Sequence, residues 1–190
     1  MKEVWLYPTE TIYGLGVNAF DAEALALLAK IKGRSANQAV SCLVRNAADI
    51  ERYAVVTPVA KKLIAKFMPG PLTIILETSD ERLQHVSVDG TASFRISPDK
   101  FAQQTVKDFM DTYGAPLTCT SANLHGQPPA RMPELILQQL GGMSQYVTKV
   151  IDGGARNGLA STVVRCVGNE VDIIRSGVIL PGDIYEASAL

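Results

Sequence analysis

The sequence has few of the residues that build metal centres and catalytic nucleophiles. Only two histidines, His85 and His125, occur in 190 residues, and neither lies at a metal-ligand spacing from the other or from a cysteine. Both lie in polar loop segments and are expected to be solvated. Ser121 and Ser161 have no histidine within local motif distance. We therefore expect no protein-held metal, and a serine-hydrolase site would need a long-range partner that the sequence does not advertise.

The three cysteines, Cys42, Cys119 and Cys166, are an odd number without a C-x-x-C pair, and each lies in an apolar run. This pattern predicts reduced, buried thiols in the cytoplasm. The amino terminus has no sustained apolar segment typical of a signal sequence, and no run approaches the about 20 apolar residues of a membrane span. We therefore expect a cytoplasmic protein with no membrane association.

The chain also lacks a strong charge of either sign. Eighteen basic residues oppose nineteen acidic ones, for a net charge of -1. This balance argues against a protein whose whole surface attracts nucleic acid, so any RNA binding should be weak and local. With 47% hydrophobic and 19% charged residues, the chain is long enough for one well-buried core. We expect a single domain over residues 1–190.

Apolar strand-like runs alternate with amphipathic helical patterns, which predicts an α/β fold. The last two strands bracket a Gly168-Asn169 turn and should pair antiparallel, so the sheet should be mixed. Expected strands include residues 4–7, 42–44, 72–76, 92–96, 117–119, 150–151 and 171–174, most of them read as buried. Expected helices cover residues 21–30, 57–67, 97–113 and 134–140.

Polar and basic residues gather in short islands beside these runs. In an open α/β sheet strand ends converge on one crevice, and a crevice with several cations and hydroxyls suits an anion. The islands are Thr9-Glu10-Thr11, Lys32-Gly33-Arg34, Arg95, Thr120-Ser121-Ala122-Asn123, Ser161-Thr162 and Arg175.

The cations in these islands differ in how easily a structural role explains them. Lys32 and Arg34 end a helical pattern, where cations offset the helix dipole, and on their own they fit that role. Arg95 lies inside an apolar strand, where an unpaired charge is costly. It needs a carboxylate, which either the protein or a ligand could supply. Arg175 likewise follows an apolar strand, at the end of the last one, and it also needs a partner for its charge.

Read in order, the islands resemble the YrdC/Sua5/TsaC family of threonylcarbamoyl-AMP synthases over about residues 4 to 180. The resemblance implies a twisted mixed parallel/antiparallel sheet flanked by helices around a large basic central cavity, in a short, single-domain form. The matching segments are Tyr7-Pro8-Thr9-Glu10-Thr11-Ile12-Tyr13-Gly14-Leu15-Gly16, Lys32-Gly33-Arg34, Pro69-Gly70-Pro71-Leu72-Thr73, Thr120-Ser121-Ala122-Asn123, Asp152-Gly153-Gly154, Ser161-Thr162-Val163 and Arg175-Ser176-Gly177.

The activity implied by the resemblance is synthesis of L-threonylcarbamoyladenylate and pyrophosphate from L-threonine, bicarbonate or CO2, and ATP. A separate tRNA-modifying threonylcarbamoyltransferase would use the adenylate to make tRNA N6-threonylcarbamoyladenosine. Mg²⁺ would be held mainly by the triphosphate, since the sequence shows no carboxylate cluster.

The resemblance also assigns residues to the two substrates. Lys32 and Arg34 would be catalytic, by neutralising charge on the phosphates. Members of the family usually carry proline where this chain has Ser35 and Ala39. The ATP contacts would be Lys32, Arg34, Gln38, Thr91, Ser121, Asn123 and Arg175. The L-threonine contacts would be Thr11, Arg95, Ser161 and the backbone at Cys119.

Two alternatives of other classes remain. A basic concave surface could belong to an RNA-binding module, which predicts strongly salt-dependent RNA affinity. The chain could also be a carbamoyl-transfer domain similar to a module of hydrogenase-maturation proteins, which handles carbamoyl-adenylate without threonine. Arg95, Thr11 and Ser161 separate the second alternative from the synthase, because only an amino-acid pocket needs a clamp for a carboxylate.

Overall fold

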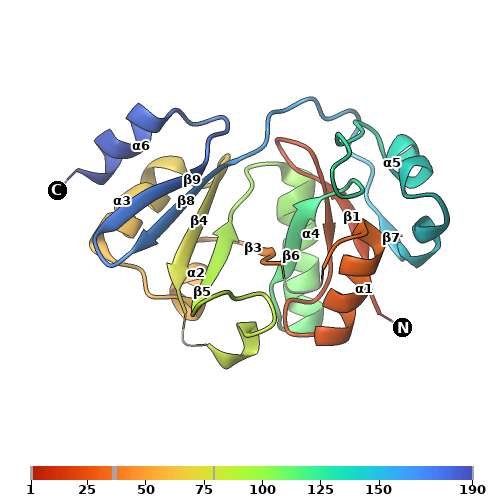
Figure 1. Cartoon of the computed structure of the whole chain (residues 1–190), viewed down its shortest axis with the longest axis horizontal. Coiled ribbons are helices and arrows are strands. Elements are labelled where there is room, and N and C mark those ends of the chain that lie inside the picture. Colours follow the sequence, from red (N-terminus) through yellow and green to blue (C-terminus); the bar gives the residue numbers. More distant parts are fainter. Residues whose placement is uncertain (1, 36–37, 79, 190) are drawn as a thin grey trace.

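The computed structural model describes residues 2–35, 38–78 and 80–189, and within them one sheet of nine strands runs through the molecule (Figure 1). The strand order is β7-β1-β2-β6-β3-β5-β4-β8-β9. The strands are β1 (Trp5–Pro8), β2 (Tyr13–Gly16), β3 (Ser41–Leu43), β4 (Leu72–Glu77), β5 (Thr91–Arg95), β6 (Leu117–Ser121), β7 (Lys149–Val150), β8 (Thr162–Val167) and β9 (Glu170–Arg175).

The sheet is mixed, as the sequence predicts. Three pairs run parallel, namely β1 with β7, β3 with β5, and β4 with β8, and the other five pairs are antiparallel. The hairpin of β8 and β9 turns at Gly168, whose φ of 59° is in the left-handed region that glycine adopts easily. The predicted α/β class with a mixed sheet is confirmed.

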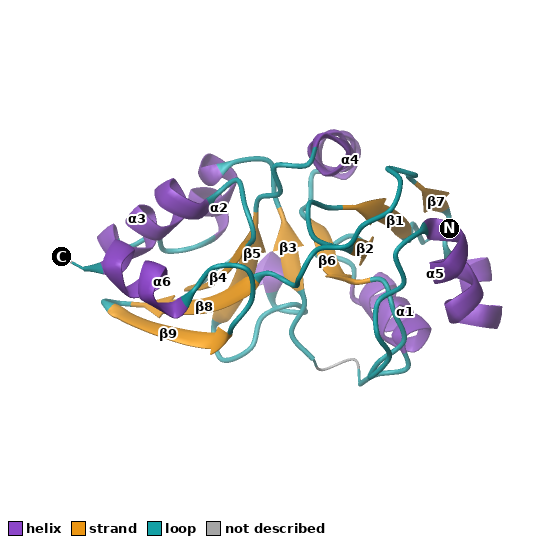
Figure 2. Cartoon of the chain, turned by 90° about the horizontal axis from the view of Figure 1, so that it is seen from above, coloured by secondary structure: helices purple, strands orange, loops and turns teal. Residues whose placement is uncertain are grey.

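Helices cover both faces of the sheet. Figure 2 shows α2, α3 and α4 on one side and α1 on the other. α6 packs against α3 at the β9 end. The helices are α1 (Ala22–Lys32), α2 (Ala47–Tyr53), α3 (Pro58–Phe67), α4 (Lys100–Tyr113), α5 (Pro133–Leu140) and α6 (Pro181–Ser188), with short 3-10 turns η1 (Glu81–Leu83) and η2 (Gly141–Tyr146). Among the described residues no helix is long and apolar enough to span a bilayer.

Capping residues set the ends of α1 and α4. The Asp21 carboxylate accepts hydrogen bonds from the first turn of α1, as predicted, and Gly33, at φ 64°, ends the helix two residues beyond the predicted end at Lys30. α4 differs from the prediction at its start. Asp99, rather than Ser97, caps it, and the Ser97 hydroxyl is then available to bind a distant side chain.

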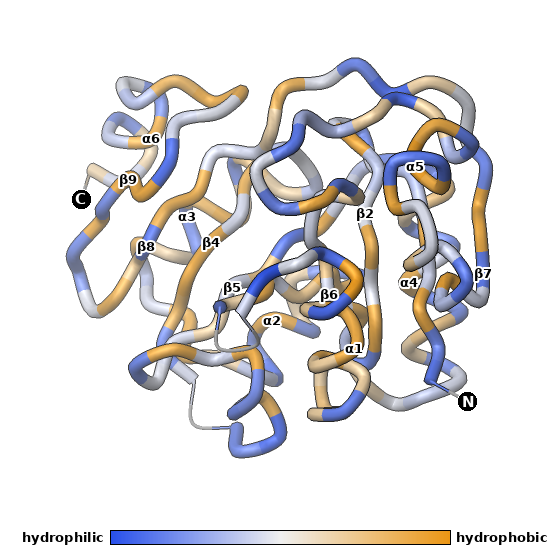
Figure 3. The backbone as a smooth tube through the Cα atoms, turned by 45° about the vertical axis from the view of Figure 1, so that its right-hand side comes forward, coloured by the Kyte–Doolittle hydropathy of each residue, from blue (hydrophilic) through white to orange (hydrophobic). Residues whose placement is uncertain are grey.

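Two runs that the sequence marks as buried strands, at residues 150–151 and 171–174, correspond to the edge strands β7 and β9. β7 is exposed throughout, and in β9 only Val171 and Ile173 are even half-buried. Figure 3 shows the contrast between the largely apolar tube of β4 and the alternating tube of β9. An apolar run indicates a strand covered on both faces only when neighbours and helices lie on both sides, which an edge strand lacks.

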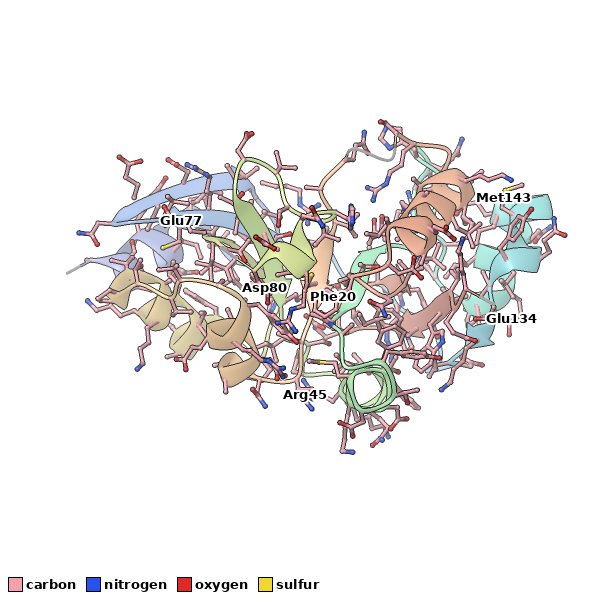
Figure 4. All side chains as sticks on the ribbon, turned by 90° about the horizontal axis from the view of Figure 1, so that it is seen from below. Phe20, Arg45, Glu77, Asp80, Glu134 and Met143 are labelled. Carbon is pink, nitrogen blue, oxygen red and sulfur yellow. The ribbon has the colours of Figure 1, made fainter. Side chains whose placement is uncertain are left out.

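On the underside of the molecule, an aromatic contact joins the segment between β2 and α1 to α2. Phe20, between β2 and α1, packs edge-on against Tyr53 of α2 with ring centroids 6.1 Å apart. The Arg82 guanidinium lies 5.0 Å from the Phe20 ring and is paired with Asp80. Figure 4 shows Phe20 and Asp80 together in this region. These contacts link the segment before α1 to α2 and to the turn that holds Arg82.

Candidate functional site

A cavity of about 370 Å³ is lined by residues from strands along the sheet, from β2 to β9. Its walls come from the turn between β1 and β2, the segment after α1, the starts of β3, β4 and β8, and the ends of β5, β6 and β9. Most of the predicted site residues line it. These are Thr11, Arg34, Arg95, Cys119, Ser121, Asn123, Ser161 and Arg175.

Three predicted site residues do not appear in the wall of this cavity as the described residues form it. Lys32 is buried behind it, Gln38 is exposed, and Thr91 lies at the start of β5 with its hydroxyl donated to the Val88 carbonyl oxygen at 2.8 Å. These three side chains do not contribute to the walls as they stand, and their predicted roles remain predictions.

The cavity is not the crevice at one sheet edge that the sequence suggests. Arg95 ends β5 and Ser121 ends β6, but β5 runs parallel to β3 while β6 runs antiparallel to it. The two carboxyl ends therefore point in opposite directions along the sheet. The rule that strand ends converge holds for parallel strands. Here the lining residues gather across a face of the sheet.

Arg95 is the most deeply buried cation of the cavity, with 6% of its surface exposed. Its Nη2 donates to Glu10 Oε1 and to Thr11 Oγ1, both at 2.7 Å. The carboxylate that this arginine requires is thus present in the protein. Burial alone would lower the pKa of Arg95, but the neighbouring Cys119 and Glu10 outweigh burial and raise it. Arg95 is therefore a permanent cation at this end.

Ser161 and Arg175 lie at the same end of the cavity. Arg175 Nη2 donates to the Ser161 carbonyl oxygen at 2.8 Å and to its Oγ at 3.2 Å. The Ser161 hydroxyl also lies 2.9 Å from Thr73 Oγ1. Burial, and secondarily the charge of Arg95, lower the pKa of Arg175. Two guanidinium groups therefore share this region, and they favour an anionic ligand between them.

At the opposite end, Lys32 and Arg34 follow one another across the Gly33 cap. Lys32 Nζ donates to the carbonyl oxygens of Ser121 and, at 2.8 Å, of Asn123. Burial, with a smaller contribution from Arg34, lowers the pKa of Lys32 to about 8. Burial also lowers the pKa of Arg34. The ammonium group of Lys32 thus fixes the backbone that leads out of β6, while Arg34 reaches the cavity.

Unsatisfied polar atoms concentrate in the cavity wall. Within the described part of the chain, five buried side-chain polar atoms have no hydrogen-bond partner. Three of them, Arg34 Nε, Arg95 Nε and Asn123 Oδ1, belong to residues that line the cavity. A buried polar atom without a partner costs about 1–3 kcal/mol, so such atoms in a cavity indicate where a ligand binds.

One segment that sequence reasoning did not place holds the turn between β1 and β2. It runs between β7 and β8, across the top of the molecule in Figure 1. Arg156 donates to the Thr9 carbonyl oxygen at 2.8 Å and pairs with Asp99 at 2.9 Å. The Gly158 amide donates to the Thr11 carbonyl oxygen at 2.9 Å. The Asp152-Gly153-Gly154 motif marked the segment in the sequence, but not its contacts.

The described residues contain no group of three or more His, Cys, Asp or Glu side chains placed to hold a metal ion. The carboxylate of Glu10, which is bonded to the cavity-lining Arg95, is already bound by Arg95 and Ser97. These residues do not form a site for Mg²⁺ bound by the protein alone, and the predicted Mg²⁺ remains a prediction.

The chain is similar to known proteins in both sequence and fold. Residues 2–177 match the family model Sua5_yciO_yrdC, described as "Telomere recombination". A putative threonylcarbamoyl-AMP synthase of Methanocaldococcus jannaschii is 35% identical over 173 residues, which cover 90% of this chain and 78% of that protein. The threonylcarbamoyl-AMP synthase of Bos taurus is 30% identical over 186 residues, covering 96% of this chain and 64% of the bovine protein.

Among solved structures, the fold is similar to P. abyssi Sua5 complexed with L-threonine. The TM-score is 0.81 at 26% identity, and the match covers 97% of this chain and 53% of that one. This chain thus spans about half to four-fifths of the length of the relatives it matches.

Proposed function

The chain belongs to the Sua5/YciO/YrdC family, whose model matches residues 2–177, and from that premise we propose that it is an L-threonylcarbamoyladenylate synthase. In this reaction L-threonine, bicarbonate or CO2, and ATP give threonylcarbamoyl-AMP and pyrophosphate, which makes the enzyme a nucleotidyltransferase. The observation that carries the proposal is a single cavity lined by Arg34, Arg95 and Arg175, with buried donors still unsatisfied at two of them.

The reaction requires no nucleophile from the protein. The threonine amine adds to CO2 and loses a proton, which gives a carbamate. A carbamate oxygen then bonds to the α-phosphorus of ATP, and the bond from that phosphorus to the pyrophosphate oxygen breaks. The protein must hold two anions together and neutralise the charge that develops on the phosphate oxygens. Arginines in a partly closed cavity suit both tasks.

The two ends of the cavity suit the two substrates. Arg95, Thr11 and Ser161 offer a buried cation and hydroxyl groups, which fit the carboxylate and polar atoms of a small amino acid. Arg34 and Asn123 at the other end fit the phosphates and the nucleoside of ATP. A relative with a similar fold is known bound to L-threonine, which supports the amino-acid assignment. Mg²⁺ would enter with the triphosphate, as part of the substrate.

The wider setting follows from the same reaction. We propose that the enzyme is cytoplasmic and that a tRNA-modifying threonylcarbamoyltransferase consumes the adenylate. The net charge of -1 favours at most weak direct RNA binding.

The test is pyrophosphate release from the purified protein with ATP, L-threonine and bicarbonate. Release should require threonine and bicarbonate together, and the adenylate should appear in equal amount by mass spectrometry. Omission of each substrate in turn is the control. Equal release with ATP alone would refute the synthase, and equal release when carbamoyl phosphate replaces threonine and bicarbonate would favour the carbamoyl-transfer alternative.

A further inference from the structure

The hydroxyl groups of Thr9 and Thr11 form a chain of hydrogen bonds whose direction is fixed. Thr9 Oγ1 lies 2.7 Å from the Ile12 carbonyl oxygen, which can only accept, so the Thr9 proton is used there. The 2.9 Å contact between the two hydroxyls must then be donated by Thr11. Thr11 Oγ1 also accepts from Arg95 Nη2. The Thr11 hydroxyl therefore has no proton left to donate to a ligand, and it can only accept a hydrogen bond from one.

Glu10 fixes the other side of Arg95. One carboxylate oxygen accepts from Arg95 Nη2 at 2.7 Å, and the other accepts from the Ser97 hydroxyl. Ser97 Oγ in turn accepts from the Asp99 amide at 3.2 Å. Both protons of Nη2 are thus taken, one by Glu10 and one by Thr11, and the guanidinium plane cannot rotate without breaking a charged hydrogen bond.

What remains for a ligand at Arg95 and Thr11 is three N–H donors, one on Arg95 Nε and two on Arg95 Nη1, and one acceptor. Arg95 Nε is buried without a partner, and Thr11 Oγ1 keeps an unused lone pair. Glu10 is absent from the described wall of the cavity, and both of its oxygens are occupied. Its effect on a ligand must therefore pass through Arg95. An α-amino acid matches these remaining groups, because its carboxylate accepts from a guanidinium and its ammonium or hydroxyl donates to a hydroxyl oxygen.

We propose that Glu10 is a positioning residue for amino-acid recognition: it holds Arg95 and, through it, Thr11 so that the cavity presents a fixed cationic donor beside a fixed acceptor. This inference rests on the proposed function, since the amino acid is its substrate. Glu10 also offsets the repulsion between Arg95 and Arg175, which share this end of the cavity. Without the carboxylate, the two guanidinium groups would move apart, and the orientation of Arg95 would be lost.

The experiment compares Glu10→Gln with a matched control, Asp49→Asn. Glutamine keeps the size and one acceptor but removes the charge. Asp49 pairs with Arg45 at the same 2.7 Å and is more buried than the half-buried Glu10. Neither Asp49 nor Arg45 lines the described cavity wall, and Arg45 is labelled on the underside in Figure 4. Threonine and ATP binding are measured separately by calorimetry, and thermal unfolding shows that each variant is folded.

We expect Glu10→Gln to weaken L-threonine binding about tenfold or more, which is the loss of one charge-assisted contact, with ATP binding changed less than about twofold. Asp49→Asn should leave both affinities near those of the wild type. In a ¹H–¹⁵N spectrum, the Arg95 Nε–H signal should shift on threonine addition in the wild type and shift less in Glu10→Gln. Ser97→Ala, which removes the second support of Glu10, should act in the same direction with a smaller effect.

Three results would overturn the inference. Unchanged threonine affinity in Glu10→Gln would remove Glu10 from recognition. An equal loss of threonine and ATP affinity, or an equal loss of threonine affinity in Asp49→Asn, would reduce its role to general stability. A wild-type protein that binds ATP but not threonine would refute the proposed function itself, so the two failures are distinguishable.

Discussion

The two ends of the cavity are built differently. At the proposed amino-acid end, Arg95 is buried and held by two side chains, and the threonines beside it are bonded to each other. At the proposed nucleotide end, Arg34 is only partly buried and Gln38 is exposed, although Nε lacks a partner in Arg34 and Arg95 alike. One end is organised before a ligand arrives, whereas the other leaves its contacts for the ligand to complete.

The difference fits the ligands proposed for each end. A small amino acid offers few contacts, so its recognition depends on groups that are already in position and lose little entropy on binding. A triphosphate brings several negative charges and many acceptor atoms, and it can order a partly exposed arginine itself. The comparison predicts that substitutions at the first end change amino-acid affinity selectively, and that those at the second change ATP affinity.

The largest expected effect is at Arg95. Arg95→Lys keeps the charge but loses the planar group that reaches Glu10, Thr11 and the ligand together. We expect the threonine concentration for half-maximal rate to rise about a hundredfold, with ATP affinity in the absence of threonine changed by less than about threefold. Equal losses for the two substrates would show that the ends are not independent.

Arg34→Ala tests the nucleotide end. Loss of a charged contact to phosphate should weaken ATP binding by about 1.5–2 kcal/mol with little change in thermal unfolding, because Arg34 Nε has no protein partner. Lys32→Ala is the informative companion. Its ammonium holds two backbone carbonyl groups, so this variant should lose stability as well as ATP affinity. Wild-type ATP affinity in Arg34→Ala would show that Arg34 does not bind ATP and only offsets the dipole at the end of α1.

The sequence predicted which residues line the cavity better than it predicted how they are arranged. Arg95 was found because a cation in an apolar strand needs a carboxylate, but its partner Glu10 lies 85 residues away. Their contact depends on the strand order, which places β1 and β2 near β5 only through β6 and β3. No local pattern carries that information. The family resemblance supplied the residues, and the topology decided which of them meet.

The sequence does not predict the strand β2, which lines the cavity, because two of its four residues are glycine. β2 contains Gly14 and Gly16, which lower the strand propensity of a short segment. Both allow close approach of neighbours. A Cβ at Gly16 would lie 2.4 Å from the Thr118 carbonyl oxygen, and one at Gly14 would lie 3.0 Å from the Tyr7 ring. The packing that requires glycine is visible only once β6 and β1 are placed beside β2.

A smaller effect is expected where the segment before β8 supports the amino-acid end. A Cβ at Gly158 would lie 2.7 Å from both the Cα and the carbonyl oxygen of Thr11, so Gly158→Ala must displace backbone. We expect about a tenfold loss of threonine affinity, comparable to one misplaced hydrogen bond, and little loss of ATP affinity. Gly182→Ala, where the added methyl meets open space, is the control. Unchanged threonine binding in Gly158→Ala would show that Thr11 need not be held in place.

The smallest expected effect is the change of stability and activity with pH that the titration of Lys32 causes. Its pKa of about 8 in the folded protein is lowered by burial from 10.5. Between these two values the folded state binds fewer protons than the unfolded state, so this group makes the protein more stable as pH rises. Any fall in ATP use between pH 7 and 8.5 is then not caused by unfolding through this group.

That fall is the last prediction. A lysine with a pKa of about 8 is mostly protonated at pH 7 and only about a quarter protonated at pH 8.5, so kcat/KM for ATP should decrease about fourfold if its charge assists the phosphates. Binding of threonine alone, measured by calorimetry without ATP or bicarbonate and governed by the permanently charged Arg95, should stay nearly level over the same interval. Lys32→Arg, which cannot titrate there, should abolish the decrease. A parallel decrease for both substrates, or its persistence in Lys32→Arg, would assign the titration to a group outside the nucleotide end.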